Sequence, residues 1–190
     1  VYVNIGYAWR GNCENDPPHV PDAENHVGSY RHTFEVPASW NGKDIFLSIG
    51  SATSNVYVWI NGRFVGYSED SKLAAEFDVT KFVRPGENLL ALQMFRWSDG
   101  TYLEDQDFWR FSGIARGVTL TARDKAHLKD VRITPTLDAD YKDAQLRVEV
   151  ETTPRVKSVG LTLQDAAGRT VAEQQVRPAG GKAGYVFHVA

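Results

Sequence analysis

The sequence predicts an all-β protein built from antiparallel β-sandwiches. Short runs of alternating apolar and polar residues recur along the whole chain, and turn residues separate them. No segment has the periodicity of a helix longer than a turn or two. Short strands at regular spacing are typical of antiparallel sandwiches, so this class is preferred over α/β and helical folds.

The clearest local signal is a β-hairpin in the first half of the chain. Two strand-like runs, Asn55–Ile60 and Arg63–Tyr67, are joined by Asn61-Gly62. This dipeptide tolerates the two positive φ angles that a type I′ turn requires. Because alternate positions of a strand face the same side, Trp59 is expected in the core. Further strands of this half are expected at 28–36, 45–49, 89–95 and 117–121.

Two segments of the first half carry more specific expectations. The apolar residues of 77–83 are spaced like one helical turn, and 84–88 form a turn that contains Pro85-Gly86. Residues 89–95 are nearly all apolar, which predicts a strand buried on both faces.

Composition changes near residues 122–125, where the dense aromatic residues of the first half nearly vanish. We therefore predict two domains, 1–123 and 124–190. Strands of the second domain are expected at 128–137, 144–151, 156–164, 170–176 and 185–189. These are fewer than the roughly seven strands of an immunoglobulin-like domain, so we expect this sandwich to be truncated at its C-terminal end.

Composition also excludes several classes of partner. The net charge is −3 without runs of like charge, which argues against nucleic-acid binding. No apolar run approaches the roughly 20 residues of a membrane span, so no membrane partner is expected. The single Cys13 forbids an internal disulfide and is compatible with both cytoplasm and periplasm. The five histidines do not fall at metal-ligand spacing.

The loop between the strands at 89–95 and 117–121 holds the candidate chemistry. It carries four acids and two tryptophans, which is unusual for a plain connection. Its acids could form the carboxylate pair of a glycosidase, or Asp107 could bind a hard cation. Alternatively, the acids pair with Arg96, Arg110 and Arg116 and only fix the loop. Aromatic rings near acids also suit sugar recognition, because a pyranose has an apolar face.

The longest motifs carry a family resemblance. The run Arg96–Ile114, with Asn61–Tyr67, Glu76–Val79 and Gly86–Leu89, resembles the β-galactosidases of glycoside hydrolase family 2. This resemblance implies a jelly-roll, galactose-binding-like sandwich, an immunoglobulin-like sandwich and then a TIM barrel with the catalytic glutamates. It implies that our chain lacks the barrel and the first jelly-roll strands. The chain is accordingly expected to hold no catalytic residue and to be inactive alone.

The resemblance implies roles for individual residues. Asp107 is similar to the residue that contacts galactose and ligates a sodium ion, whose other ligands come from the barrel. Asp16, before Pro17-Pro18, is similar to a residue at the sugar hydroxyls, although an asparagine stands there in some members. Trp109 and Arg110 are expected to hold the loop, and Glu104 and Asp105 to support it. The complete enzyme could also use magnesium.

The function that follows is a non-catalytic part of a β-galactosidase. The complete enzyme would hydrolyse terminal β-D-galactosides such as lactose with retention, and this part would line the galactose subsite and supply one cation ligand. Its expected partners are the barrel of the same polypeptide and further copies of the enzyme. Two alternatives stay open: a self-sufficient carbohydrate-binding module, and a structural module for oligomer contacts without a ligand.

Overall fold

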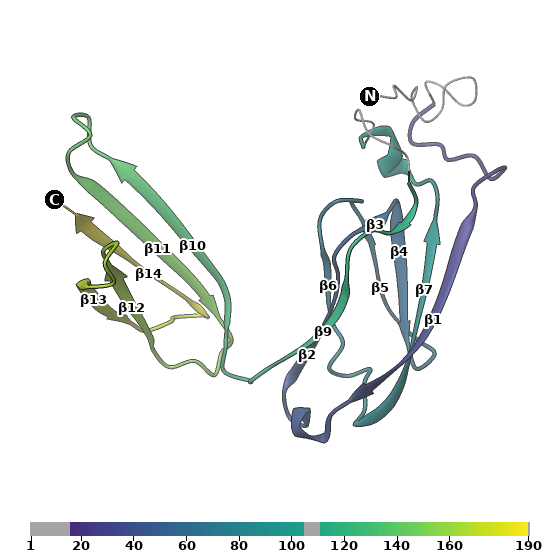
Figure 1. Cartoon of the computed structure of the whole chain (residues 1–190), viewed down its shortest axis with the longest axis horizontal. Coiled ribbons are helices and arrows are strands. Elements are labelled where there is room, and N and C mark those ends of the chain that lie inside the picture. The colour runs from purple at the N-terminus through teal and green to yellow at the C-terminus, as the bar shows by residue number, and fades with distance from the viewer. Residues whose placement is uncertain (1–15, 105–110, 190) are drawn as a thin grey trace. The chain divides into compact units, whose positions relative to one another are not determined.

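The structure, a computed structural model, describes residues 16–104 and 111–189. It is all-β, as predicted, with only two single-turn 3₁₀ helices among the described residues. The chain divides into two compact units, Val1–Ala122 and Arg123–Ala190 (Figure 1). No helix in the described ranges is both long enough and apolar enough to span a membrane.

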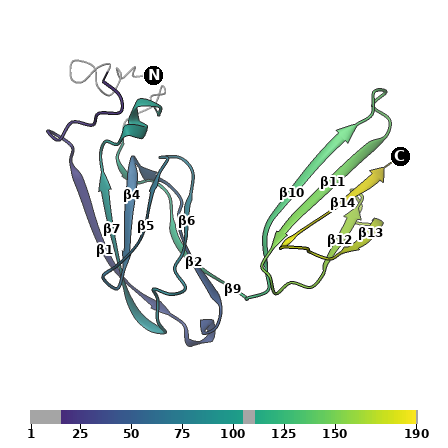
Figure 2. The ribbon, with the colours of Figure 1, turned by 180° about the vertical axis from the view of Figure 1, so that it is seen from behind.

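Unit 1 is a sandwich of antiparallel sheets. One sheet has the strand order β1-β7-β4-β5, formed by Val27–Val36, Gly86–Phe95, Asn55–Ile60 and Arg63–Glu69. The other has the order β6-β2-β9, formed by Ala75–Asp78, Asp44–Ile49 and Val118–Arg123. A short pair, β3 (Ala52–Thr53) with β8 (Gly113–Ile114), completes the described sheets of this unit. Figure 2, seen from behind, shows the same two layers.

The predicted hairpin is confirmed. Ile60 pairs with Arg63, and the link between them has positive φ angles, 52° at Asn61 and 76° at Gly62. The core prediction for Trp59 is wrong, because Val56, Val58 and Ile60 are the fully buried side chains of β4. Both faces of β4 are apolar, so periodicity could not decide which face points inward. Trp59 lies on the opposite face beside Tyr57, with ring centroids 6.1 Å apart.

Two further expectations need correction. The expected helical turn is shorter than 77–83: Phe77 and Asp78 end β6, and the turn is made by 79–83, where the N–H groups of Phe82 and Val83 donate to Val79 O at 2.8 and 3.2 Å. Strand β7 is fully buried on one face only, since Leu90, Leu92 and Met94 belong to the core while the residues between them are half-buried. The outer face of this sheet is therefore apolar but only partly covered.

An asparagine pair fixes the end of the sandwich at which β4 turns into β5. Asn88 is 1% exposed, and its amide donates to the carbonyls of Arg84 and Gly86 at 2.7 and 2.8 Å. Its Oδ1 accepts the Arg84 N–H and the Asn61 amide at 2.9 and 2.8 Å. Asn61 Oδ1 in turn accepts the Leu89 N–H at 3.0 Å. Each polar group of the buried amide is thus satisfied, as burial requires.

Unit 2 has two described antiparallel sheets. One has the order β10-β11-β14, from Leu128–Leu137, Ala144–Thr152 and Lys182–Val189. The second pairs β12 (Val159–Gln164) with β13 (Thr170–Val176). A small core joins them, made by Val148, Val150, Val176 and Phe187.

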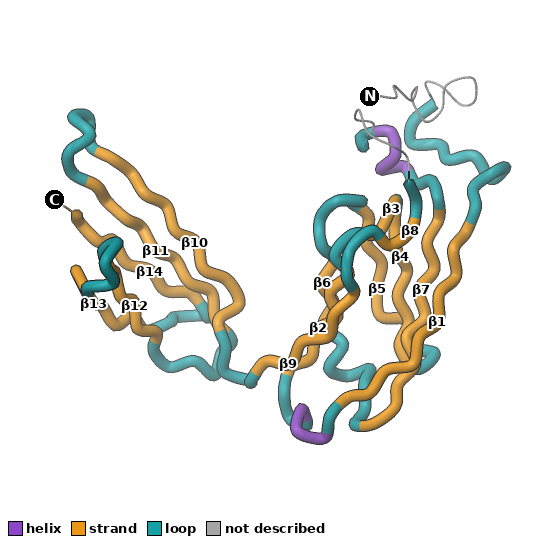
Figure 3. Tube along the Cα trace, in the orientation of Figure 1, coloured by secondary structure: helices purple, strands orange, loops and turns teal. Residues whose placement is uncertain are grey.

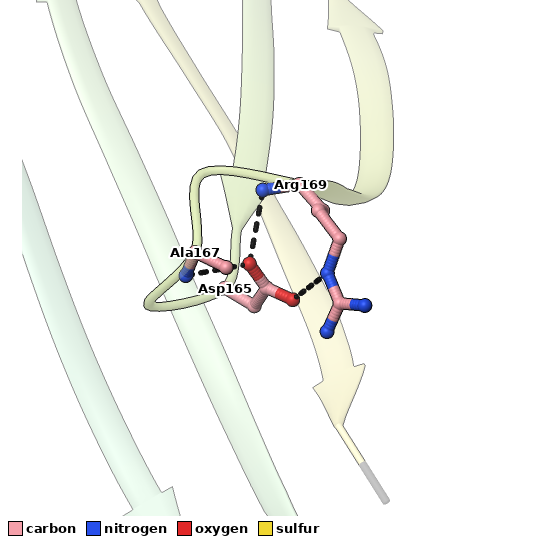
Figure 4. A network of polar contacts seen from close by, with 3 residues as sticks. All are labelled: Asp165, Ala167 and Arg169. Carbon is pink, nitrogen blue, oxygen red and sulfur yellow. Dashed lines mark hydrogen bonds and ion pairs between the residues drawn. The ribbon is translucent and has the colours of Figure 1, made fainter.

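The turn between β12 and β13 is held by one carboxylate. Asp165 Oδ1 accepts the N–H groups of Ala167 and Arg169, both at 2.9 Å, and Oδ2 accepts the Arg169 Nε–H at 2.7 Å (Figure 4). These bonds stabilise the ionised carboxylate, so the pKa of Asp165 lies below its usual value.

Candidate functional site

The candidate site lies at the end of unit 1 where β7 leaves the sheet and β1 enters it. The 3₁₀ turn η2 (Asp99–Tyr102) follows β7 at this end, close to the segment that leads into β1 (Figure 3). The turn between β5 and β6 also reaches this end. Three segments that are far apart in sequence therefore meet here.

Asn25 continues the pairing of β1 with β7 beyond the last strand residues. The register ends at Val27 opposite Phe95, and Arg96 N–H then donates to His26 O at 2.9 Å. One residue farther from the strands, the Asn25 side chain makes the two backbone hydrogen bonds that a strand residue would otherwise make. Its Oδ1 accepts the Trp97 N–H at 3.0 Å and its Nδ2 donates to the Trp97 carbonyl at 3.2 Å. The segment before β1 is thus tied to the loop.

Asp16 belongs to a turn on this segment. Its carbonyl accepts the His19 N–H at 2.8 Å across Pro17-Pro18, whose peptide bond is cis. The His19 carbonyl accepts the Tyr102 hydroxyl at 2.7 Å, which joins the turn to η2. Asp16 itself is exposed. The structure therefore places this predicted sugar contact beside the loop predicted to hold the chemistry.

Of the other loop residues with predicted roles, the structure describes Glu104. Asp107, predicted to contact sugar and sodium, lies outside the described residues, as do Asp105, Trp109 and Arg110. Glu104 is described, and its Oε1 accepts the Ser71 N–H at 2.7 Å while its Oε2 accepts the Ser71 hydroxyl. Ser71 is 1% exposed, so Glu104 ties the loop to a buried residue of the β5–β6 turn. This contact gives Glu104 a supporting position.

The two described loop arginines contact a ring and backbone carbonyls, while the pairing expected by the loop-fixing alternative also involves Asp105, Asp107 and Arg110, which lie outside the described residues, so that alternative stays a prediction. The Arg96 guanidinium lies over the Trp97 ring, 4.8 Å from its centroid. Arg116 donates through one guanidinium nitrogen to the carbonyls of Lys72 and Gly50 at 2.7 and 3.4 Å. Arg96 therefore contacts an aromatic ring and Arg116 contacts backbone carbonyls, while Glu104 accepts hydrogen bonds from Ser71.

An open groove of about 450 Å³ lies beside the Asp16 turn. Its lining includes Asn25, Tyr57, Tyr67, Glu69, Trp97 and Asp99. The rings of Tyr57 and Tyr67 are 4.5 Å apart between centroids, and the Tyr67 hydroxyl donates to Glu69. Rings next to carboxylates offer an apolar platform and hydrogen-bond acceptors, the two features that a sugar ring can use.

Two groove residues, Tyr67 and Glu69, have pKa values raised above their usual ones. Burial and the nearby Asp99 carboxylate raise the pKa of Glu69, although the hydrogen bond from Tyr67 acts in the opposite direction. Burial first, and then the hydrogen bond to Glu69, raise the pKa of Tyr67. Tyr67 and Glu69 were missed in the sequence because they appeared as ordinary hairpin residues. Their spacing of two residues at the end of a strand, which puts both on one face, is the only signal there.

No group of three or more His, Cys, Asp or Glu within the described ranges could hold a metal ion. Sodium and magnesium are bound by several oxygen ligands, so the described residues alone do not form such a site. The cation prediction therefore depends on Asp107 together with ligands from elsewhere.

Comparison with known proteins confirms the resemblance. Residues 1–124 match the family model of glycosyl hydrolases family 2, sugar binding domain. β-Galactosidases from Aeromonas hydrophila and Clostridium acetobutylicum are 48% and 41% identical over 80% and 93% of this chain, which spans 14% and 20% of their length. The β-galactosidase of Priestia megaterium is 45% identical over 79% of the chain, which spans 14% of that protein.

Solved structures give the same fold. A β-glucuronidase from an uncultured Clostridium species superposes with a TM-score of 0.72 at 26% identity, over 88% of this chain and 30% of that one. The Bifidobacterium dentium β-glucuronidase, complexed with coumarin-3-O-glucuronide, has a TM-score of 0.73 at 21% identity, over 87% and 34%. Because the family model covers well over half of the sequence, this chain belongs to glycosyl hydrolase family 2 and carries that family's sugar-binding domain at residues 1–124.

Proposed function

We propose that this chain is the non-catalytic N-terminal part of a β-galactosidase that hydrolyses terminal β-D-galactosides with retention. The observation that carries the proposal is the match to relatives named β-galactosidase at 41–48% identity, of whose length the chain spans 14–20%. The carboxylates that perform the hydrolysis then belong to the barrel, and this chain contributes to the galactose subsite.

Galactose is preferred over glucuronic acid as the recognised sugar. The two solved relatives named above, both called β-glucuronidase, are only 21% and 26% identical to the chain, well below the three β-galactosidases. A site for a glucuronide carboxylate would also favour an arginine or lysine as its partner. The described groove presents Glu69 and Asp99 instead, and these would repel such a carboxylate.

Asp16 and Asp107 are the two residues proposed to contact the sugar. The position of Asp16 supports this, because the Asp16 turn is exposed and bonded through His19 to Tyr102 of η2. Asp107 follows η2 by five residues and is assigned by resemblance. Asp107 would also ligate a sodium ion, with the remaining oxygen ligands supplied by the barrel. A sodium ion there would supply positive charge beside the sugar hydroxyls.

The decisive experiment compares this chain with the complete enzyme. Tryptophan fluorescence of the isolated chain is followed during titration with galactose, with glucose and glucuronate as controls, in sodium and then potassium buffer. We expect no saturable response from the isolated chain, because half of the subsite is absent. In the complete enzyme, Asp107→Ala should weaken galactoside binding and abolish activation by sodium. Unchanged kinetics of that variant across a sodium titration would refute the assignment.

A second candidate function is favoured by the groove beside Tyr57 and Tyr67. If the chain is a carbohydrate-binding module, galactose should produce a saturable and selective fluorescence change in the isolated chain. Tyr57→Ala should then abolish the change, whereas Trp40→Phe, at the opposite end of the sandwich, should preserve it. That pair of results would replace the leading proposal.

A further inference from the structure

The Asp16 turn is held in place from outside the turn. Within the described residues, the hydrogen bond of Asp16 is the one that its backbone carbonyl accepts from the His19 N–H. The orientation of its carboxylate therefore depends on where the backbone of the turn lies. An exposed turn with one internal bond needs further contacts to keep a single position.

Tyr102 supplies such a contact at the turn itself. Its hydroxyl donates to the His19 carbonyl at 2.7 Å, and His19 is also the residue whose N–H closes the turn onto Asp16. Tyr102 comes from η2, whose backbone is fixed by bonds of its own. Ser98 N–H donates to Thr101 Oγ1 at 3.1 Å, and Thr101 N–H donates to Ser98 O at 3.0 Å. A fixed loop thus holds the turn through one hydroxyl.

Asn25 provides an independent tie farther along the same segment, through its two bonds to the Trp97 backbone. Asn25 fixes where the segment meets the loop, but five residues, 20–24, separate it from His19, which closes the turn. Among the described residues, Tyr102 is therefore the contact whose loss would free the turn while the rest of the segment stays attached.

We infer that Tyr102 is a positioning residue for Asp16, and that its hydroxyl sets the affinity for galactosides through that residue. This inference depends on the proposed function, in which Asp16 contacts the sugar. Tyr102 itself does not need to touch the substrate. Because the Asp16 contact is proposed to be made equally in the bound substrate and in the transition state, its loss should raise KM much more than it lowers kcat.

The test uses the complete β-galactosidase that contains this chain, with a nitrophenyl β-galactoside as substrate. Tyr102→Phe removes one hydroxyl and keeps the ring. A hydrogen bond of this kind corresponds to about a three- to tenfold change in an equilibrium, so KM should rise by about that factor while kcat stays within about twofold. Tyr141→Phe is the matched control, because Tyr141 is a 79% exposed tyrosine of unit 2, and its KM should not change.

A double-mutant cycle separates this inference from the proposed function. Asp16→Ala should raise KM, and the double variant Asp16→Ala/Tyr102→Phe should have the KM of Asp16→Ala alone. If Asp16→Ala leaves KM unchanged, the proposed sugar contact itself fails. If Asp16→Ala raises KM but Tyr102→Phe does not, or if the two effects add independently, only the positioning role is refuted.

Discussion

The two units of the chain use the same strand pattern but bury it to different extents. In unit 1, Val56, Val58 and Ile60 have no exposed surface, and the core joins residues of both sheets. In unit 2, Ile133 pairs with the buried Val148 in register and so shares its face, yet Ile133 is 59% exposed. A strand pattern therefore determines which face is apolar, whereas the neighbouring layer determines whether that face is buried.

This difference has energetic and functional consequences. Burial of apolar surface stabilises a fold by roughly 25 cal/mol per Å², so equal side chains contribute unequally in the two units. The candidate site lies on unit 1, where β7, the strand that leads into the loop, buries one face in the core. A rigid scaffold is the usual support for loops that bind ligands. Substitution of matched side chains in the two units measures how much this difference in burial contributes to stability.

The largest effect is expected for Ile60→Ala. Removing a fully buried isoleucine side chain leaves a cavity and should lower the free energy of unfolding of unit 1 by about 3 kcal/mol. The same change at the 59% exposed Ile133 should cost unit 2 less than about 1 kcal/mol. Urea unfolding, followed by NMR signals of each unit, measures both values. Equal losses would mean that the exposed face of β10 is covered in solution, and the comparison would fail.

Asn88→Ala should produce the next largest effect, again in unit 1. The substitution removes the buried amide and leaves the Arg84 N–H and the carbonyls of Arg84 and Gly86 without this partner. Buried polar groups that lose their partner cost about 1–3 kcal/mol, so we expect a loss of about 2–3 kcal/mol. Asn41→Ala, at an exposed turn, is the control and should change stability by less than about 0.5 kcal/mol. Similar values for both would show that the amide network contributes little.

The sequence predicted the strands of both units better than the packing between them. The Asn61-Gly62 hairpin has a local physical cause, the positive φ of two adjacent residues, and was found for that reason. No local feature of the sequence determines on which face of β4 Trp59 lies, because Val56 and Tyr57, on opposite faces, are both acceptable core residues. The choice depends on the facing sheet, which the sequence pattern does not contain.

The candidate site was predictable in its residue types but not in its connections. The loop acids and Asp16 stood out through composition and resemblance. The Asn25 contact to Trp97 spans 72 residues, and the Tyr102 contact to His19 spans 83. Contacts between residues so far apart depend on the complete fold. Glu69 was missed for the same reason, since only folding brings it to Asp99.

A smaller effect is expected in the pH dependence of stability, which should differ between the two units. Burial raises the pKa of Glu69 above 4.5, so the folded state of unit 1 holds this proton more tightly than the unfolded state. The stabilisation is fully present below the unfolded pKa and is lost as pH rises through the folded pKa. Glu69→Gln should remove this decline and raise the melting temperature of unit 1 at neutral pH. Melting curves of both proteins between about pH 4 and pH 8 provide the measurement, and parallel pH profiles would contradict the assignment.

The smallest effect is expected at Asp165 in unit 2, and its pH dependence has the opposite sign. Backbone and side-chain bonds from Arg169 hold the pKa of Asp165 below 3.8, so its stabilisation is present above the unfolded pKa and is lost as pH falls through the folded pKa. Asp165→Ala should therefore lower the urea midpoint of unit 2 slightly at neutral pH, and the difference from the unmodified protein should disappear near about pH 2. Asp140→Ala, in another turn of the same unit, is the control and should change the urea midpoint at neutral pH less than Asp165→Ala does. If the deficit of Asp165→Ala persists in acid, the turn is stabilised by something other than the ionised carboxylate.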